Sequence, residues 1–324
     1  MKIAVYNYRK FDEAKYFDKF GEQYGAEILP IPATPTMENV NAASGCDAVS
    51  CITTPIGEDL LKAWAEMGVK HVSTRTIGFD HIDLEAAKKY GIGISNVTYS
   101  TGSVADYTVM MILMALRRMK TIVRRADGWD YSLMGSIGRE IQDLTVGIIG
   151  TGKIGAHVIR NLSGFGCKMI AYDPYPNDSL KDLVTYMPVE QLMKEADVIT
   201  LHAQATEDNF HLINKETIET MKDGIVIVKT ARGTIIDTTA LIDALESGKI
   251  GAAAIDVIEN EAGIYYGDYK SVVLKNRELA ILRDMPNVLS TPHMAFYTEN
   301  AVSDMVENSI RHIVSKDGNI VPEK

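Results

Sequence analysis

The chain has 324 residues, of which 46% are hydrophobic, enough for sizeable buried cores in about two domains. Its formal net charge of -10 argues against nucleic acid or an anionic membrane surface as the main partner, so we expect a small-molecule ligand. The longest strongly apolar stretch, residues 109–116, is much shorter than the roughly 20 residues of a membrane-spanning helix. No targeting segment is visible, and the three cysteines form no CxxC pair, which favours a cytoplasmic protein with reduced thiols.

The first hundred residues alternate short apolar runs with helix-like stretches. The runs predict strands at 2–6, 26–32, 47–54, 71–76 and 93–98, with candidate helices at 57–67 and 84–90. This rhythm predicts a small α/β domain.

Residues 103–120 follow as a helix-like segment that is apolar around most of its circumference. An exposed helix could not have this pattern, because part of its surface must face water. We therefore expect this helix at a domain junction or against a second subunit.

From residue 144 onward the apolar runs become nearly continuous. They read LTVGIIG, CKMIAYD, DVITLHA, GIVIVKTAR, GAAAIDVIE and NVLSTPH, and a final helix-like stretch covers 298–315. Continuous apolar strands that alternate with helices are typical of a parallel sheet covered on both faces. Ligands bind outside the carboxyl ends of such strands, and all six runs end in polar residues or glycine.

A glycine-rich turn follows the first of these strands. Gly150, Gly152 and Gly155 allow a tight turn, a close approach of the backbone to a pyrophosphate, and close packing of the next helix. Asp173 ends the next apolar run, where a carboxylate can accept hydrogen bonds from an adenosine ribose, which favours NAD over NADP. The predicted cofactor contacts are Gly150, Thr151, Gly152, Lys153, Ile154, Gly155, Asp173, His202, Ala203, Thr230, Ala231 and Asp256.

Because this fingerprint begins near residue 150, another domain must precede it. We predict an α/β fold of two Rossmann-like, doubly wound parallel-sheet domains with a cleft between them. Residues 101–296 would form the NAD-binding Rossmann domain. Residues 1–100 plus 297–324 would form a discontinuous, flavodoxin-like substrate (catalytic) domain, because the last helix is expected to cross back to the first half.

Three residues near predicted strand ends are candidates for catalysis. The planar guanidinium of Arg232 can bind a substrate carboxylate through two hydrogen bonds, and His293 can hand a proton to a carbonyl. Glu261 can bond the second imidazole nitrogen, fixing its tautomer and favouring its protonated form. Taken singly, each has a structural alternative: a turn-stabilising salt bridge, a packed histidine and a solvated loop acid. Behind one dinucleotide fingerprint they describe a dehydrogenase.

Other residues are candidates for substrate or cofactor contacts, but the sequence supports them less strongly. Asp256 ends an apolar strand, where an unpaired charge is costly, so we expect it to meet the nicotinamide carboxamide, with a buried structural acid as the alternative. Amides around Ile77 and Gly78 can bind a carboxylate, and Tyr99 can close over the substrate, although these residues can also be packing residues. Phe296 is expected in the cleft, where it would affect which substrate side chain is preferred. The histidines show no metal-ligand spacing, so we expect no metal.

Six motifs, TRTIGFDHID, NVTYSTGSVADYT, TVGIIGTGKIG, TARGTIIDT, DVIENEAG and TPHMAFYTE, together resemble the NAD-dependent D-2-hydroxyacid dehydrogenases over essentially the whole chain. The likeness is greatest to the D-lactate and D-2-hydroxyisocaproate branch, and the NVxYSxxSVADYT form is similar to the D-lactate dehydrogenases of vancomycin-resistance clusters. The resemblance implies a homodimer built around the 103–120 helix and closure of the domains over substrate. It also implies that Arg232 holds the carboxylate, His293 is the acid/base and Glu261 tunes it.

The chain departs from the family pattern at three positions. Thr101 and Gln204 replace prolines, and Met294 follows the histidine where threonine or isoleucine is commoner. A flexible methionine there can admit a larger substrate side chain or simply fill space.

The predicted function is reversible, NADH-dependent reduction of a 2-oxo acid to the (R)-2-hydroxy acid. The first candidate reaction is the reduction of pyruvate to D-lactate. The alternative substrates are larger branched or aromatic 2-oxo acids. A formate dehydrogenase would have glutamine in place of Glu261, and phosphoglycerate dehydrogenases often carry a regulatory extension. An NAD-sensing binding protein is a remote alternative of another class.

Overall fold

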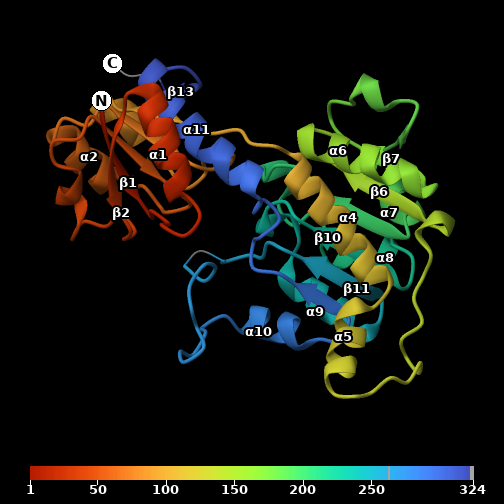
Figure 1. Cartoon of the computed structure of the whole chain (residues 1–324). Helices are drawn as coiled ribbons and strands as arrows, with labels where there is room; N and C mark the ends of the chain where they lie inside the picture. Colours follow the sequence, from red (N-terminus) through yellow and green to blue (C-terminus); the bar gives the residue numbers. More distant parts are fainter. Residues whose placement is uncertain (262, 322–324) are drawn as a thin grey trace. The chain divides into compact units, whose positions relative to one another are not determined.

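The computed structural model describes residues 1–261 and 263–321, shown in Figure 1. By their internal contacts these residues divide into two compact units, described separately below. The first unit is Met1–Ser100 together with the segment that starts at Tyr297, and the second is Thr101–Phe296.

The first unit is built on a six-stranded sheet in the order β13-β5-β4-β3-β1-β2. Its strands are β1 (Lys2–Tyr6), β2 (Glu27–Ile31), β3 (Ala48–Cys51), β4 (His71–Thr74), β5 (Gly93–Ser95) and β13 (Asn319–Val321). All neighbours pair in parallel except β13, which is antiparallel to β5. Its helices are α1 (Ala14–Tyr24), α2 (Glu58–Glu66), α3 (Leu84–Tyr90) and α11 (Glu299–Ser315).

Apolar side chains cover both faces of this sheet. One core contains Trp64 of α2, and the other contains Phe17 of α1 with Ile310 of α11. The helix α11 therefore packs beside α1, although the two are almost the whole chain apart in sequence (Figure 1).

The second unit is built on a seven-stranded, all-parallel sheet in the order β12-β11-β10-β9-β6-β7-β8. Its strands are β6 (Thr145–Ile149), β7 (Lys168–Tyr172), β8 (Thr185–Tyr186), β9 (Val198–Leu201), β10 (Ile225–Lys229), β11 (Ile250–Ile255) and β12 (Val288–Ser290). Its helices are α4 (Gly102–Leu116), α5 (Met119–Asp127), α6 (Lys153–Leu162), α7 (Val189–Glu195), α8 (Lys215–Thr220), α9 (Thr238–Ser247) and α10 (Arg277–Asp284).

The strand order reverses at β6, which pairs with β7 on one side and with β9 on the other. Such a reversal opens a crevice at the carboxyl ends of the strands, because the following connections leave to opposite faces of the sheet. The strand interiors are buried in two apolar cores, one on each face. The sheet therefore presents its polar strand ends at a single edge.

The predicted α/β class with parallel sheets is confirmed, but three elements differ from the sequence analysis. The strands β8 and β13 were not predicted, since two or three residues carry no periodic signal. The segment predicted as one helix at 103–120 is two helices, because Arg118 has a left-handed backbone (φ 52°) between α4 and α5. No helix within the described residues is both long and apolar enough to cross a membrane.

Candidate active site

The glycine turn after β6 has the geometry that the fingerprint predicts. Gly150 has a positive φ of 93°, and a Cβ there would lie 2.6 Å from the amide nitrogen of Ala203. A Cβ at Gly155 would collide with the carbonyl oxygen of Gly150, so only glycine lets α6 pack this closely. Gly152, in contrast, borders open space, and α6 begins next to it without a side-chain cap. The turn therefore offers an open backbone surface and a helix N-terminus that fit a pyrophosphate.

Asp173 lies directly after β7 and holds this turn. Its Oδ2 accepts hydrogen bonds from the amide of Thr151 at 2.6 Å and from the Thr151 hydroxyl at 3.2 Å. Its Oδ1 accepts one from the amide of Tyr175 at 2.8 Å. The hydroxyl of Tyr186 in β8 donates to Thr151 Oγ1 at 3.0 Å. The carboxylate predicted to bind the ribose is thus already fixed beside the glycine turn.

His293 and Glu261 form a direct pair at the other half of the same edge. Nδ1 of His293 lies 2.7 Å from Oε1 of Glu261, and the two side chains are about a quarter exposed, at 24% and 23%. Oε2 of Glu261 accepts from the amide of Ile258 at 3.0 Å, which fixes the carboxylate. Because Nδ1 faces the carboxylate, Nε2 is the imidazole nitrogen left to act on a substrate.

Arg232 lies in the turn after β10, next to the loop that carries Glu261. Its backbone leads into the 3-10 turn Gly233–Ile235, where a Cβ at Gly233 would collide with the carbonyl oxygen of Ile258. The turn that carries Arg232 and the loop after β11 are therefore in direct backbone contact. Arg232, Glu261 and His293 follow β10, β11 and β12, three neighbouring strands of one sheet.

Asp256 corrects one step of the sequence argument, because its carboxylate is not unpaired. Asp256 is fully buried, and its Oδ1 accepts from the hydroxyl of Thr291 at 2.6 Å and from the amide of Met294 at 2.8 Å. Its Oδ2 accepts from the amide of Ala295 at 2.9 Å. These contacts match the alternative of a buried structural acid, since they anchor the loop that carries His293. A contact with nicotinamide stays a prediction.

Three comparisons with known proteins agree with this geometry. A sequence model of the D-isomer specific 2-hydroxyacid dehydrogenase NAD binding domain matches residues 109–295. The chain is 42% identical over 316 residues to an aromatic 2-oxoacid reductase of Clostridium sporogenes. This alignment covers 97% of this chain and 95% of the relative. The chain is also 42% identical over 311 residues to a D-specific alpha-keto acid dehydrogenase of Enterococcus faecium, covering 96% of this chain and 95% of the relative.

The solved structure of a D-lactate dehydrogenase from Treponema pallidum has a TM-score of 0.89 at 33% identity and covers 99% of both chains. The chain belongs to the D-isomer specific 2-hydroxyacid dehydrogenases. The resemblance inferred from the motifs is confirmed, together with the enzyme class, NAD as the cofactor and NAD-dependent reduction of a 2-oxo acid.

Four further predicted cofactor contacts of this dehydrogenase lie at the ends of β9 and β10. His202 and Ala203 follow β9, and Thr230 and Ala231 follow β10. Burial lowers the pKa of His202 to about 3, so its ring is neutral at ordinary pH, and it contacts Thr200 Oγ1 at 2.9 Å. Beyond Ala203 lies a cavity of about 640 Å³ lined by Ala205, Thr206, Glu207 and Phe210.

The predicted substrate contacts of the dehydrogenase are divided between the two units. Ile77, Gly78 and Tyr99 belong to the first unit, where the carbonyls of Ile77 and Gly78 accept hydrogen bonds from Asn96 and Thr76. Phe296 belongs to the second unit, where its ring centroid lies 6.4 Å from that of His293 in an edge-to-face arrangement. The contacts of these four residues with a substrate remain predictions.

The sequence analysis missed the contacts of three residues in the loops that follow β9 and β11. Tyr266 donates from its hydroxyl to the carbonyl of His293 at 2.9 Å, and its ring lies 6.4 Å from the imidazole. His211 and Glu259 form a second histidine–glutamate pair with an Nε2 to Oε1 distance of 2.7 Å. A tyrosine or a histidine in a loop gives no spacing signal, so these contacts could not be found without the fold. Among the described residues, no cluster of histidine, cysteine and acidic groups is suited to a metal ion.

Proposed function

We propose that Arg232 binds the carboxylate of a 2-oxo acid, that His293 transfers the proton, and that Glu261 orients His293. The single observation that carries this proposal is the 2.7 Å contact between His293 Nδ1 and Glu261 Oε1 at the strand edge beside the Arg232 turn. When bound at the glycine turn, NADH supplies the hydride for the carbonyl carbon. The imidazolium of His293 then donates its Nε2 proton to the carbonyl oxygen, so that a neutral hydroxyl forms.

Arg232 contributes binding and orientation. A guanidinium can donate two parallel hydrogen bonds to a carboxylate, which fixes the rotation of the substrate as well as its position. A substrate held in this way keeps one face of its carbonyl toward the cofactor, which is the basis for forming a single enantiomer. The family is specific for the D isomer, and the expected product is the (R)-2-hydroxy acid.

For the substrate we propose pyruvate, reduced to D-lactate. Larger aromatic 2-oxo acids are the second candidate, and a specific observation favours them. Tyr266 and Phe296 present their rings to His293 and to each other, with centroid separations of 6.4 to 6.5 Å. Flat rings of this kind can stack on an aromatic substrate. The similarity to a relative named aromatic 2-oxoacid reductase points the same way.

The deciding experiment measures kcat/KM for NADH-dependent reduction of pyruvate, 2-oxobutyrate, 4-methyl-2-oxopentanoate and phenylpyruvate, with His293→Ala as the control. A preference for pyruvate supports the D-lactate dehydrogenase, and a preference for phenylpyruvate supports the second candidate. If the chain binds NADH but reduces none of these acids, the remote alternative of an NAD-sensing binding protein takes precedence.

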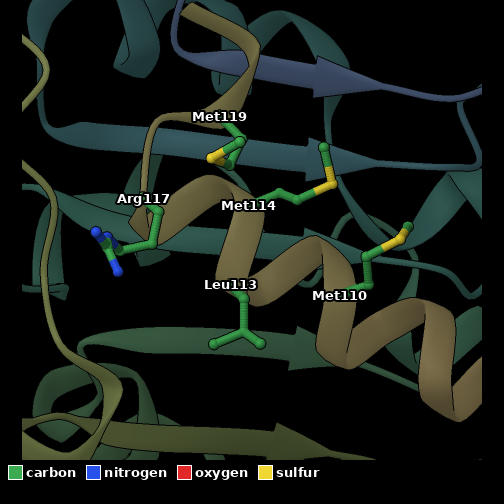
Figure 2. Close-up of a pocket in the computed structure, with 5 residues that line it drawn as sticks. All are labelled: Met110, Leu113, Met114, Arg117 and Met119. Atoms are coloured by element: carbon green, nitrogen blue, oxygen red, sulfur yellow. The ribbon is translucent and has the colours of Figure 1, made fainter. Parts of the chain in front are cut away.

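We further propose that the active form is a homodimer in the cytoplasm. Met110, Leu113 and Met114 of α4 line a groove of about 430 Å³ with Arg117, which follows α4, and Met119 of α5 (Figure 2). The opposite side of α4, including Met111 and Ile112, is buried in the core of its own unit, whereas Met110 is 40% exposed.

The segment after α5 adds a second apolar surface. Five large apolar side chains in it are between 72% and 89% exposed, namely Trp129, Tyr131, Leu133, Met134 and Ile137. A monomer rarely exposes so much apolar surface in one short stretch, and a second copy of the chain would cover it. Met110→Glu together with Leu133→Glu is expected to convert a dimer to a monomer in light scattering. A wild-type chain that is monomeric at micromolar concentration would contradict the proposal.

A further inference from the structure

Lys229 is a buried lysine that has no part in the catalytic roles proposed above. It is the last residue of β10, and it is only 1% exposed. A buried ammonium loses its hydration, which costs free energy unless protein groups replace the lost water contacts. Nζ of Lys229 donates to the carbonyl oxygen of Gly233 at 3.0 Å. This hydrogen bond links the end of the strand to the turn that carries Arg232.

The place of Gly233 makes this link relevant to the site. Gly233 follows Arg232 directly, and its backbone lies so close to the carbonyl of Ile258 that no Cβ would fit. The lysine therefore holds a turn that is in backbone contact with the loop leading to Glu261. A shift of the Gly233 carbonyl would move Arg232 and press on that loop.

The charged groups that face Lys229 belong to the same loop. They are the carboxylates of Glu259 and Glu261, and they oppose the effect of burial, which lowers the pKa of Lys229 to about 8. Each carboxylate also holds a histidine: Glu259 contacts His211, and Glu261 contacts His293.

We propose that Lys229 is a positioning residue that holds the Arg232 turn through its hydrogen bond to the Gly233 carbonyl. This inference rests on the proposed role of Arg232. It has a measurable consequence, because a displaced Arg232 binds the substrate carboxylate less well, which raises KM.

The test replaces Lys229 by methionine, which has a similar length but neither charge nor donor. We expect Lys229→Met to raise KM for the 2-oxo acid about tenfold, the usual effect of losing one charged hydrogen bond. NADH affinity should be unchanged. Lys249→Met is the matched control, because Lys249 also donates to a carbonyl, that of Met221 at 2.7 Å, but lies directly before β11.

Lys229→Arg keeps a charged donor at this position and is expected to raise KM less than Lys229→Met does. A folded Lys229→Met enzyme with wild-type KM would overturn the proposal. If Lys229→Met fails to bind NADH, the arginine variant decides: a KM close to the wild-type value supports the proposal, and a KM raised about tenfold, as for loss of the bond, overturns it. Failure of the catalytic roles themselves would show differently, as wild-type activity in His293→Ala.

Discussion

Glu261 holds Nδ1 of His293 at 2.7 Å, while its second oxygen accepts the amide of Ile258 at 3.0 Å. One oxygen of the carboxylate therefore binds the backbone after β11, while the other orients the imidazole. His293 itself has a left-handed backbone (φ 53°) and donates its amide to the carbonyl of Asp256 at 2.9 Å. The histidine is thus held from its backbone and from its ring, and only Nε2 is left to exchange a proton with a substrate.

Glu261→Gln is expected to lower kcat for 2-oxo acid reduction at neutral pH by about ten- to hundredfold, because a neutral amide stabilises the imidazolium less than a carboxylate does. The measurement is steady-state kcat with the 2-oxo acid. Glu259→Gln is the control, since it removes the carboxylate that holds His211 and should leave kcat in place. An unchanged kcat for Glu261→Gln would show that the carboxylate does not act through His293.

Asp173→Ala is expected to weaken NADH binding by about tenfold or more, because the amide of Thr151 loses its acceptor and the ribose loses a carboxylate. The preference for NADH over NADPH should fall at the same time, since the charge that repels a 2′-phosphate is gone. Fluorescence titration with both cofactors measures this. Asp178→Ala, which removes an exposed acid of the same segment paired with Lys181, is the control. Equal loss for both cofactors would limit Asp173 to a role in loop structure.

The sequence predicted the parallel sheets and the site edge because both depend on local patterns. Apolar runs identify buried strands wherever they lie, and a glycine triplet has few other uses directly after a strand. Arg232, Glu261 and His293 could be selected because they follow three successive strands, and parallel strands bring their carboxyl ends to one edge. The prediction of their roles awaits the kinetic tests.

The sequence could not predict contacts that depend on the path of a loop. Asp256 was expected to contact the nicotinamide carboxamide, with a buried structural acid as the alternative. The backbone after β12 turns so that the amides of Met294 and Ala295 point at its carboxylate. The hydrogen bond of the Lys229 ammonium could not be predicted for the same reason, since its partner is a backbone carbonyl. Such partners carry no sequence signal, because every residue has a backbone.

Asp256→Ala is expected to destabilise the protein by about 3 kcal/mol and to lower kcat, because two buried amides and the Thr291 hydroxyl lose their acceptor. Urea unfolding and steady-state kinetics measure the two effects. Asp256→Asn separates anchoring from cofactor binding, because it keeps one acceptor oxygen. A stable Asp256→Asn enzyme with normal NADH affinity assigns the residue to the loop. A stable enzyme that has lost NADH affinity would instead support the predicted contact with nicotinamide.

Lys229 should give the stability of the chain a measurable pH dependence. Burial lowers its pKa from 10.5 to about 8, so the unfolded chain holds more protons at this residue than the native one between those values. The contribution of Lys229 to the free energy of unfolding therefore rises with pH across that window and is lost as pH falls from 10.5 to about 8.

Relative to Lys229→Met, the wild-type chain should thus gain about 2 to 3 kcal/mol between about pH 7 and about pH 10, measured by urea unfolding. Taking the difference between the two proteins removes the contribution of the tyrosines, which they share. A difference between wild type and Lys229→Met that stays constant with pH would mean that the buried lysine keeps its ordinary pKa, held there by Glu259 and Glu261.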